Sequence, residues 1–355
     1  MVKKYLKGSF VYVFYRRLKN FNKTDRDEFV RKFYGDYAPA DIKSIKRALK
    51  WSFLIGGVRY KEFWMRSFEK KGLSEKKQFV PRSAELNLYY QVNPREKYAE
   101  LLEDKMSCYE FFKPYYKREM VYIKRENDSI SFTDKDFFNR HTKFVVKPMG
   151  LSGGYGFRII DTTKDVFPLE EMLEKYPRGL VAEEFIVQKE EMAQFHKESV
   201  NCVRVNTVNF GDRIEIKWPF FKMGRGQSIV DNGCAGGIFA VIDVNSGMTM
   251  KAADERRNTY TNHPDTGLRI LDFKIPEWSV LCDMAIELAK KCPDCHIMGW
   301  DMAYTEKGWV VVECNYGPNL IYQYVCEKGF NKDFQNVRKR LSAQRFKGYN
   351  KPWQF

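Results

Sequence analysis

The sequence lacks any apolar run long enough to cross a bilayer, and it contains no internal repeat and no low-complexity linker. The apolar stretch Phe10–Tyr15, near a charged start, is too short for a signal peptide and has no small-residue cleavage site. We therefore expect a cytoplasmic protein, with a peripheral location at the inner face of the membrane as an open alternative. Its eight cysteines should then be mostly reduced.

Signatures of covalent catalysis and of haem or zinc binding are also missing or incomplete. We find no convincing Ser–His or Cys–His pattern, and the four histidines show no spacing typical of metal ligands. The segment Cys292-Pro-Asp-Cys-His296 matches C-x-x-C-H, but haem attachment requires export and a zinc site would need a second cysteine pair. No Gly-Lys-Ser/Thr sequence closes a phosphate loop either, which excludes a P-loop.

Positive charge is concentrated at the two ends of the chain. The net charge of the 355 residues is +15; residues 1–20 carry six Lys or Arg and no acid, and residues 331–355 carry seven and one acid. Basic ends interleaved with aromatic residues suit an anionic membrane face, an acidic polymer or nucleic acid. No recognisable nucleic-acid module accompanies them, so we expect no nucleic-acid partner. A solvated basic tail is the simpler alternative.

The distribution of apolar residues predicts an α+β fold. Residues 20–80 have helical patterns, whereas strands mixed with short helices begin near residue 120. The predicted later strands are 203–209, 214–221, 237–244, 248–252, 299–305 and 308–313, and helices are predicted near 277–291 and 331–346. Because these strands form hairpins joined by short turns, they favour α+β over a parallel doubly wound sheet.

The stretch Phe144–Ile160 predicts a strand, a glycine-rich turn and a second strand. Its glycines allow the backbone to approach a ligand and to direct several N–H groups at an anion, so phosphate is the expected ligand. Lys147 on the incoming strand could place an ammonium over the same phosphates. Gly150-Leu-Ser-Gly-Gly154 also matches the G-x-S-x-G nucleophile elbow, but that motif needs a helix where we expect a strand. A structural hairpin without a ligand is the remaining alternative.

A second group of polar residues lies in the predicted hairpin 299–315. Glu313 and Asn315 are two residues apart on a strand and so face the same side, and an antiparallel partner can place Asp301 opposite them. Two carboxylates and an amide oxygen are hard ligands suited to Mg²⁺ shared with phosphates. The flanking residues are strongly apolar, which makes unpaired carboxylates costly there without a cation. Strand-end acids that face water are the alternative.

A third segment, Leu180–Ile186, is a short strand that contains two consecutive acids. Its backbone could hydrogen-bond to the edge of an adenine, and a carboxylate could accept a hydrogen bond from the adenine amino group or from ribose. Taken alone, the segment is typical of an ordinary edge strand.

The order and spacing of these segments resemble the ATP-grasp superfamily, most closely the sugar-transfer-associated ATP-grasp proteins found with polysaccharide-assembly enzymes. The resemblance runs from about residue 97 to 325. The matched segments are Asp104-Lys105, Lys147-Pro148 with the glycine turn, Glu183–Ile186, Ser199–Arg204, Val230–Asn232 with Gly236-Gly237, and Asp301 with Glu313-Cys-Asn315. It implies a helical N-terminal region (1–95), an ATP-grasp domain (96–330, with lobes of about 97–187 and 188–330) and a basic C-terminal helix or tail (331–355).

The resemblance also implies roles for individual residues. The triphosphate would be held by Lys105, Lys147, Gly150, Ser152, Gly153, Gly154 and Gly156. Adenine and ribose would be held by Glu183, Glu184, Ile186 and Glu190, with Glu191 as an alternative ribose contact. Two Mg²⁺ ions would be bound by Asp301, Glu313 and Asn315. The γ-phosphate and the developing anion would be faced by Arg204, with Lys222 and Arg225.

The implied reaction is ATP-dependent activation of a carboxylate as an acylphosphate, which an amine or a hydroxyl then attacks. Such a ligase needs no covalent enzyme nucleophile. The resemblance places it in surface-polysaccharide biosynthesis, of capsule or exopolysaccharide, where the basic ends would contact the anionic membrane or the polysaccharide machinery. A phosphotransferase acting on a sugar hydroxyl and a non-catalytic nucleotide-binding scaffold at the membrane are the alternatives; the acceptor, the donor and the oligomeric state stay open.

Overall fold

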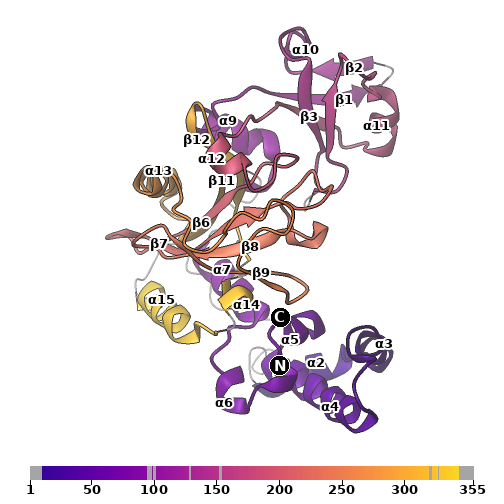
Figure 1. The fold of residues 1–355 in the computed structure, drawn as a ribbon, viewed down its shortest axis with the longest axis vertical. Coiled ribbons are helices and arrows are strands. Elements are labelled where there is room, and N and C mark those ends of the chain that lie inside the picture. Colours follow the sequence, from indigo (N-terminus) through magenta and orange to yellow (C-terminus); the bar gives the residue numbers. More distant parts are fainter. Residues whose placement is uncertain are drawn as a thin grey trace, which may run out of the picture. The chain divides into compact units, whose positions relative to one another are not determined.

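The computed structural model describes residues 10–93, 98, 101–127, 129–151, 154–319, 322–326 and 328–343. The chain forms two units, one made of residues 1–94 together with 319–355 and the other of residues 95–318. Figure 1 shows that helices dominate the first unit and that the strands lie in the second.

Local capping signals define the helices of the first unit. The side chain of Asn22 accepts hydrogen bonds from the backbone N–H groups of Thr24 and Asp25 at the start of α3, and Pro39 opens α4. The helices are α2 (Phe10–Lys19), α3 (Lys23–Tyr34), α4 (Pro39–Gly56), α5 (Tyr60–Met65), α6 (Leu73–Lys76), α7 (Arg82–Val92), α14 (Tyr322–Cys326) and α15 (Asn331–Ala343), with a 3₁₀ turn, η1, at Phe68–Lys70.

Hydrogen bonds join the C-terminal helices to the N-terminal part of the first unit. The Gln323 side chain donates to the carbonyl of Val80 (3.0 Å) and accepts from its N–H (2.7 Å). The N–H of Asn331 donates to the carbonyl of Gln78 at 2.8 Å. Segments from opposite ends of the sequence therefore form one unit. The helix expected over 331–346 is α15, and residues 344–346 lie outside the described part of the chain.

A five-stranded sheet occupies the first part of the second unit, in the order β2-β1-β5-β3-β4. Its elements are β1 (Met120–Glu126), β2 (Ser129–Phe132), α10 (Phe137–Arg140), β3 (Lys143–Pro148), β4 (Arg158–Asp161), α11 (Leu169–Lys175) and β5 (Leu180–Glu184). Met172 and Leu173 of α11 and Phe137 of α10 share one buried core with apolar residues of β1, β3 and β5. The short helices thus cover one face of this sheet.

A seven-stranded antiparallel sheet follows, in the order β10-β9-β8-β7-β6-β11-β12. Its elements are α12 (Glu190–Ala193), β6 (Val203–Asn209), β7 (Ile214–Met223), a 3₁₀ turn η2 (Gly233–Ala235), β8 (Ile238–Ile242), β9 (Thr249–Asp254), β10 (Thr259–Tyr260), α13 (Trp278–Lys291), β11 (Ile297–Thr305) and β12 (Gly308–Asn315). Helix α9 (Lys105–Tyr116) packs against this sheet through Phe112, whose ring meets Trp300 edge-on at 5.4 Å.

Candidate active site

The glycine turn between β3 and β4 needs glycine for steric reasons. Gly150, Gly154 and Gly156 have φ angles of +74°, +81° and +73°, in the left-handed region that L side chains rarely adopt. A Cβ atom at Gly156 would also lie 2.6 Å from the ring of Pro148 and 2.7 Å from the hydroxyl of Tyr176. A strand follows the turn, so the structure does not support the nucleophile-elbow alternative.

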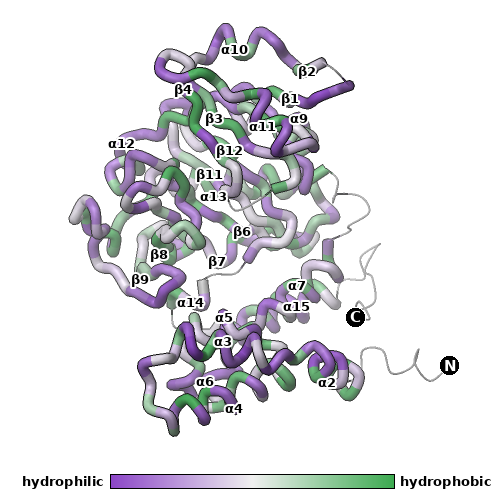
Figure 2. The backbone as a smooth tube through the Cα atoms, turned by 90° about the vertical axis from the view of Figure 1, so that its right-hand side faces the viewer, coloured by the Kyte–Doolittle hydropathy of each residue, from purple (hydrophilic) through white to green (hydrophobic). Residues whose placement is uncertain are grey.

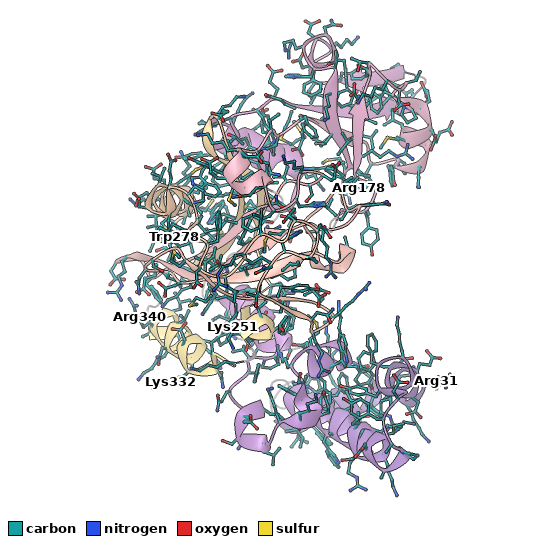
Figure 3. All side chains as sticks on the ribbon, viewed as in Figure 1. Arg31, Arg178, Lys251, Trp278, Lys332 and Arg340 are labelled. Carbon is teal, nitrogen blue, oxygen red and sulfur yellow. The ribbon has the colours of Figure 1, made fainter. Side chains whose placement is uncertain are left out.

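The same turn meets the segment between β7 and β8. A Cβ atom at Gly154 would lie 3.3 Å from the side-chain nitrogen of Asn232 and 3.4 Å from Val230. Arg178, labelled in Figure 3, lies beside Gly150 of the same turn. Residues 152–153, both predicted phosphate contacts, lie outside the described residues. The turn therefore extends from the five-stranded sheet to a loop of the seven-stranded sheet.

A partly buried Lys147 and a buried Glu183 form an ion pair on adjacent strands of the five-stranded sheet. The ammonium of Lys147 lies 2.7 Å from one oxygen of Glu183, and the guanidinium of Arg118 donates to the other oxygen at 2.8 and 3.1 Å. Burial raises the pKa of Glu183, but the two cations outweigh it and lower that pKa to about 2. Glu183 is therefore a permanently ionised anchor for the Lys147 side chain.

Arg118 connects this ion pair to the seven-stranded sheet. Its guanidinium also donates to the carbonyl of Val312 (3.3 Å) and to that of Val311, both on β12. Close by, the ammonium of Lys307 donates to the carbonyl of Lys117 (2.9 Å), and that of Lys117 donates to the carbonyl of Lys307 (2.8 Å). The junction of α9 and β1 is thus bound to β12 and to the turn that precedes it.

Lys105 lies where groups from both sheets converge. Asp104 accepts a hydrogen bond from the N–H of Ser107 and so sets the start of α9, with Lys105 as its first residue. The ammonium of Lys105 donates to the carbonyl of Leu151 in the glycine turn at 2.7 Å. The pKa of Lys105 is lowered, chiefly by burial and also by the nearby ammonium of Lys147 in β3. The carboxylates of Glu313 in β12, Glu183 and Asp104 act in the opposite direction and raise this pKa. Lys105 is therefore electrostatically coupled to both sheets and contacts the turn.

A second buried network is centred on Asp301 in β11. Arg204 of β6 binds both carboxylate oxygens of Asp301 (2.5 and 2.6 Å), and the ammonium of Lys222 in β7 lies 3.1 Å from one of them. Lys222 also pairs with Asp231 at 3.3 Å, and Asp231 accepts from the N–H of Cys202 at 3.0 Å. Burial raises the pKa of Asp301, but Arg204 and Lys222 lower it to about 2. The cations that compensate this buried carboxylate are protein side chains.

The predicted metal ligands have the expected register. Asp301 lies opposite Glu313 across the β11–β12 ladder, Asn315 lies opposite Gly299, and Glu313 is exposed. The buried side-chain nitrogen of Asn315 has no hydrogen-bond partner among the described residues, so an amide flip would present an oxygen there without losing a hydrogen bond.

Whether these residues fit Mg²⁺ depends on the number of donors. In the described part of the chain, no group of three or more His, Cys, Asp or Glu side chains is arranged to hold a metal ion. The predicted set offers two carboxylates and one amide, which suits a hard cation only if phosphate oxygens complete the shell. Oδ1 of Asp301 is bound by Arg204 alone and keeps a lone pair, whereas Oδ2 is bound by both Arg204 and Lys222. The donors therefore fit an ion shared with a nucleotide, not a protein-only site.

Arg225 is separate from the Asp301 network. Its guanidinium donates to Asp254 at 2.9 Å and to the hydroxyl of Tyr260, and the hydroxyl donates to the same carboxylate oxygen of Asp254 at 2.9 Å. The structure therefore brings Arg204 and Lys222 together around Asp301 and places Arg225 in its own cluster with β9 and β10.

The predicted adenine and ribose contacts follow the end of β5. Glu184 accepts from the N–H of Glu119 (3.1 Å) and from the ammonium of Lys307 (3.1 Å), and Ile186 is half-buried. Glu190 opens α12 as an exposed residue 3.3 Å from the ammonium of Lys197. Only Glu183 of the four predicted residues is buried in the ion-pair network.

Sequence reasoning did not single out two residues of these ion-pair networks. Arg118 sits between α9 and β1, outside any glycine, acid or strand motif, so no local signal pointed to it. Asp231 lay within the matched segment Val230–Asn232, but only its pairing with Lys222 indicates a role.

Acidification is expected to destabilise the unit of residues 95–318. Glu183 has a pKa of about 2 in the fold against an ordinary value of 4.5, so the native carboxyl holds a proton more weakly than the unfolded one. Its contribution, on the order of 3 kcal/mol, is fully present above the unfolded pKa and is lost as the pH falls through the folded pKa. Asp301 contributes with the same sign, because its pKa falls from an ordinary value of 3.8 to about 2 in the fold.

Urea unfolding at neutral pH and at several pH values below 4.5 measures this effect at Glu183. Glu183→Gln should lower the neutral-pH stability and make the acid dependence shallower, whereas Glu126→Gln, which changes an exposed acid of β1, should leave both unchanged. A wild-type free energy of unfolding that stays constant through this range would contradict the assignment.

Comparison with known proteins places these observations in a family. The sequence profile described as sugar-transfer-associated ATP-grasp matches residues 83–339, which include every candidate site residue. No curated protein matches the sequence.

Several solved structures are similar in fold. D-alanine–D-alanine ligase from Helicobacter pylori has 14% identity and a TM-score of 0.43, over 70% of this chain and 61% of that one. The ATP complex of D-alanine–D-alanine ligase from Bacillus anthracis has 12% identity and a TM-score of 0.41, over 70% and 66%. The ADP complex of N5-carboxyaminoimidazole synthetase from Staphylococcus aureus has 14% identity and a TM-score of 0.41, over 67% of this chain and 52% of that one. This chain thus covers less than two thirds of each of these proteins.

The family match confirms the expectation drawn from the order of the motifs, and with it the α+β ATP-grasp fold preceded by a helical region. It extends over more than half of the chain. The chain belongs to the sugar-transfer-associated ATP-grasp family.

Proposed function

We propose that the protein is an ATP- and Mg²⁺-dependent ligase that activates a carboxylate for attack by an amine or a hydroxyl. The observation that carries this proposal is the position of Lys105. It contacts the glycine turn at Leu151 and is coupled to Lys147 of one sheet and to Glu313 of the other. Two ammonium groups beside a turn that directs backbone groups at an anion are suited to a polyphosphate.

The chain's own residues account for the charge changes of the reaction. A carboxylate oxygen attacks the γ-phosphorus of ATP, the bond to the bridging oxygen breaks, and ADP leaves. Lys105 and Lys147 offset the negative charge of the phosphates, and Arg204 and Lys222 offer positive charge beside Asp301. Mg²⁺, held by Asp301, Glu313 and Asn315 together with phosphate oxygens, would supply further charge neutralisation when bound.

The second half of the reaction forms the product. The amine or hydroxyl attacks the acyl carbon, the carbon–oxygen bond to phosphate breaks, inorganic phosphate leaves, and the nucleophile gives up a proton. Water competes with that nucleophile. Gly154 of the glycine turn lies close to Val230 and Asn232, which supports a role for the turn in excluding water.

The pathway and location are part of the same proposal. The description of the family links it to sugar transfer, so we infer an acceptor in surface-polysaccharide assembly on the cytoplasmic side of the membrane. Among the described residues, no helix combines the length and apolar character needed to span a bilayer.

Lys105→Met is expected to weaken ATP binding by about tenfold or more, because it removes a charged hydrogen-bond donor from the phosphate site. Calorimetry with and without Mg²⁺ measures this change in affinity. The matched control is Lys113→Met, because Lys113 lies on the same helix but is exposed and pairs with Glu110.

Glu313→Ala should reduce the Mg²⁺-dependent part of the affinity for ATP and leave the Mg²⁺-free part unchanged, as the same calorimetry would show.

Absence of ATP binding by the wild type would contradict the proposal that the protein is an ATP-dependent enzyme. With acceptors that release phosphate, oxygen isotope from the acceptor carboxylate should appear in that phosphate. Its absence would contradict the ligase and favour transfer of phosphate to a hydroxyl.

A further inference from the structure

Helix α2 carries a row of exposed apolar side chains. Val11, Tyr15 and Leu18 are 69%, 52% and 47% exposed. They are spaced four and three residues apart, so they lie on one face of the helix. Three large apolar residues on one exposed helical face form a row rather than scattered single positions, and a row of this kind marks an interaction surface.

Helix α4 carries a second such row. Trp51 and Ile55 are 47% and 56% exposed and lie one turn apart. The two helices are joined at this end, because the guanidinium of Arg17 in α2 donates to the carbonyls of Leu54 (3.2 Å) and Ile55 (2.6 Å) in α4. Figure 2 shows hydrophobic and hydrophilic segments alternating along both helices. We call Val11, Tyr15, Leu18, Trp51 and Ile55 the docking face.

Positive charge accompanies this apolar surface. Helix α2 contains Arg16, Arg17 and Lys19 and no acid, and α4 contains four Lys or Arg and one acid. The ammonium of Lys19 lies 4.9 Å from the ring centre of Tyr15, and that of Lys50 lies 5.8 Å from the ring centre of Trp51. Aromatic and aliphatic groups flanked by Lys and Arg are the composition of helices that lie in the interface of an anionic bilayer.

We propose that the docking face binds the surface of an anionic lipid bilayer, with α2 lying in the membrane–water interface. The apolar side chains enter the boundary between headgroups and acyl chains, and the neighbouring Lys and Arg contact lipid phosphates. The positive charge of α2 favours an anionic bilayer over a second copy of the chain as the partner. A symmetric dimer through α2 would bring two basic helices without acids together, and they would repel each other. The proposal does not rest on the ligase chemistry.

Flotation of the full-length protein with lipid vesicles tests this inference. Vesicles of phosphatidylcholine mixed with phosphatidylglycerol should bind the protein, and vesicles of phosphatidylcholine alone should bind it at least about tenfold more weakly at low salt. The triple variant Val11→Ser, Tyr15→Ser, Leu18→Ser should lose about tenfold or more in binding to the mixed vesicles, because it removes most of the apolar area of α2.

Two further variants make the result specific. Arg16→Glu with Lys19→Glu should weaken binding to the mixed vesicles by more than fivefold per site and reduce its dependence on phosphatidylglycerol. Val166→Ser changes a valine of the other unit that is 90% exposed, more than Val11, and should have no effect. Thermal melting of each variant checks that the fold is intact.

Equal binding to both vesicle types, or full binding by the folded triple variant, would overturn the proposal. Failure of the wild type to float with mixed vesicles would do the same. A dimer in solution that the triple variant disrupts, without any vesicle binding, would identify the docking face as an interface between copies instead.

Discussion

Asp301→Asn is expected to lower the free energy of unfolding of the unit of residues 95–318 by about 3 to 5 kcal/mol, because it removes one partner from a buried ion-pair network. Arg204 binds both oxygens of Asp301, and Lys222 reaches one of them at 3.1 Å. Both cations are buried. Burial lowers their pKa values, but Asp301 raises that of Arg204, and Asp231 together with Asp301 raises that of Lys222. Asparagine has nearly the same shape but no charge, so Arg204 would be left without its carboxylate.

Urea unfolding followed by tryptophan fluorescence suits this test, since Trp218, Trp300 and Trp309 are buried in the seven-stranded sheet. The control is Asp272→Asn, which removes an exposed carboxylate paired with Arg269 at 2.6 Å and should change the free energy by no more than about 1 kcal/mol. If the Asp301 variant were as stable as this control, the network would not hold the β6–β11 pair together. Loss of nucleotide binding in a folded Asp301 variant would in addition support the metal role.

Local signals in the sequence were sufficient to predict the hairpins. The strand expected over 203–209 is β6, with the same ends, and the helix expected over 277–291 is α13, which begins one residue later. In each case β-branched or periodic apolar residues are bounded by residues that favour turns or helix ends. The strands expected at 237–244 and 248–252 are displaced at their ends, as β8 and β9 are Ile238–Ile242 and Thr249–Asp254.

The order of the strands could not be predicted in this way. β5 pairs between β1 and β3, and β11 pairs with β6, some 90 residues earlier in the chain. Likewise, the contacts of Gln323 with Val80 join residues 243 apart in sequence. Such pairings depend on which surfaces bury the most apolar area together, and no short-range pattern records that.

Two-residue periodicity led to the expectation that Asp301 would lie opposite the acids of β12, and Asp301 does pair with Glu313. The short turn Glu306-Lys307 does not by itself give this register, because a bulge between Asp301 and Met302 shifts the pairing by one residue. The sequence also indicated that a buried carboxylate needs a cation, but it could not indicate that Arg204 and Lys222 supply one. Those two residues reach Asp301 only because β6 and β7 stack beside β11, and this is a property of the sheet order.

Arg118→Met is expected to cost about 3 kcal/mol in the free energy of unfolding, because a buried carboxylate and two carbonyls each lose a charged donor. Arg118 donates to Glu183 at 2.8 and 3.1 Å and to the carbonyls of Val311 and Val312. Methionine retains the apolar stem but none of the donors. Lys147 would then be the remaining cation on Glu183, and the pKa of Glu183 should rise toward its ordinary value.

Two results distinguish this positioning role from a general loss of packing. Loss of stability on acidification should be smaller in Arg118→Met than in the wild type and should end at a higher pH, since less of the depression of the Glu183 pKa remains. Hydrogen exchange should also speed up in β5 and β12, which Arg118 joins, before it does in β8 and β9.

Arg125→Met, which removes a half-exposed arginine of β1 paired with Glu170, should change neither quantity. Arg118→Lys should restore little, because an ammonium cannot bind a carboxylate and two carbonyls in the geometry of a guanidinium. If the variant's stability depended on low pH as the wild type's does, and hydrogen exchange in β12 were unchanged, Glu183 and Lys147 would keep their positions without Arg118.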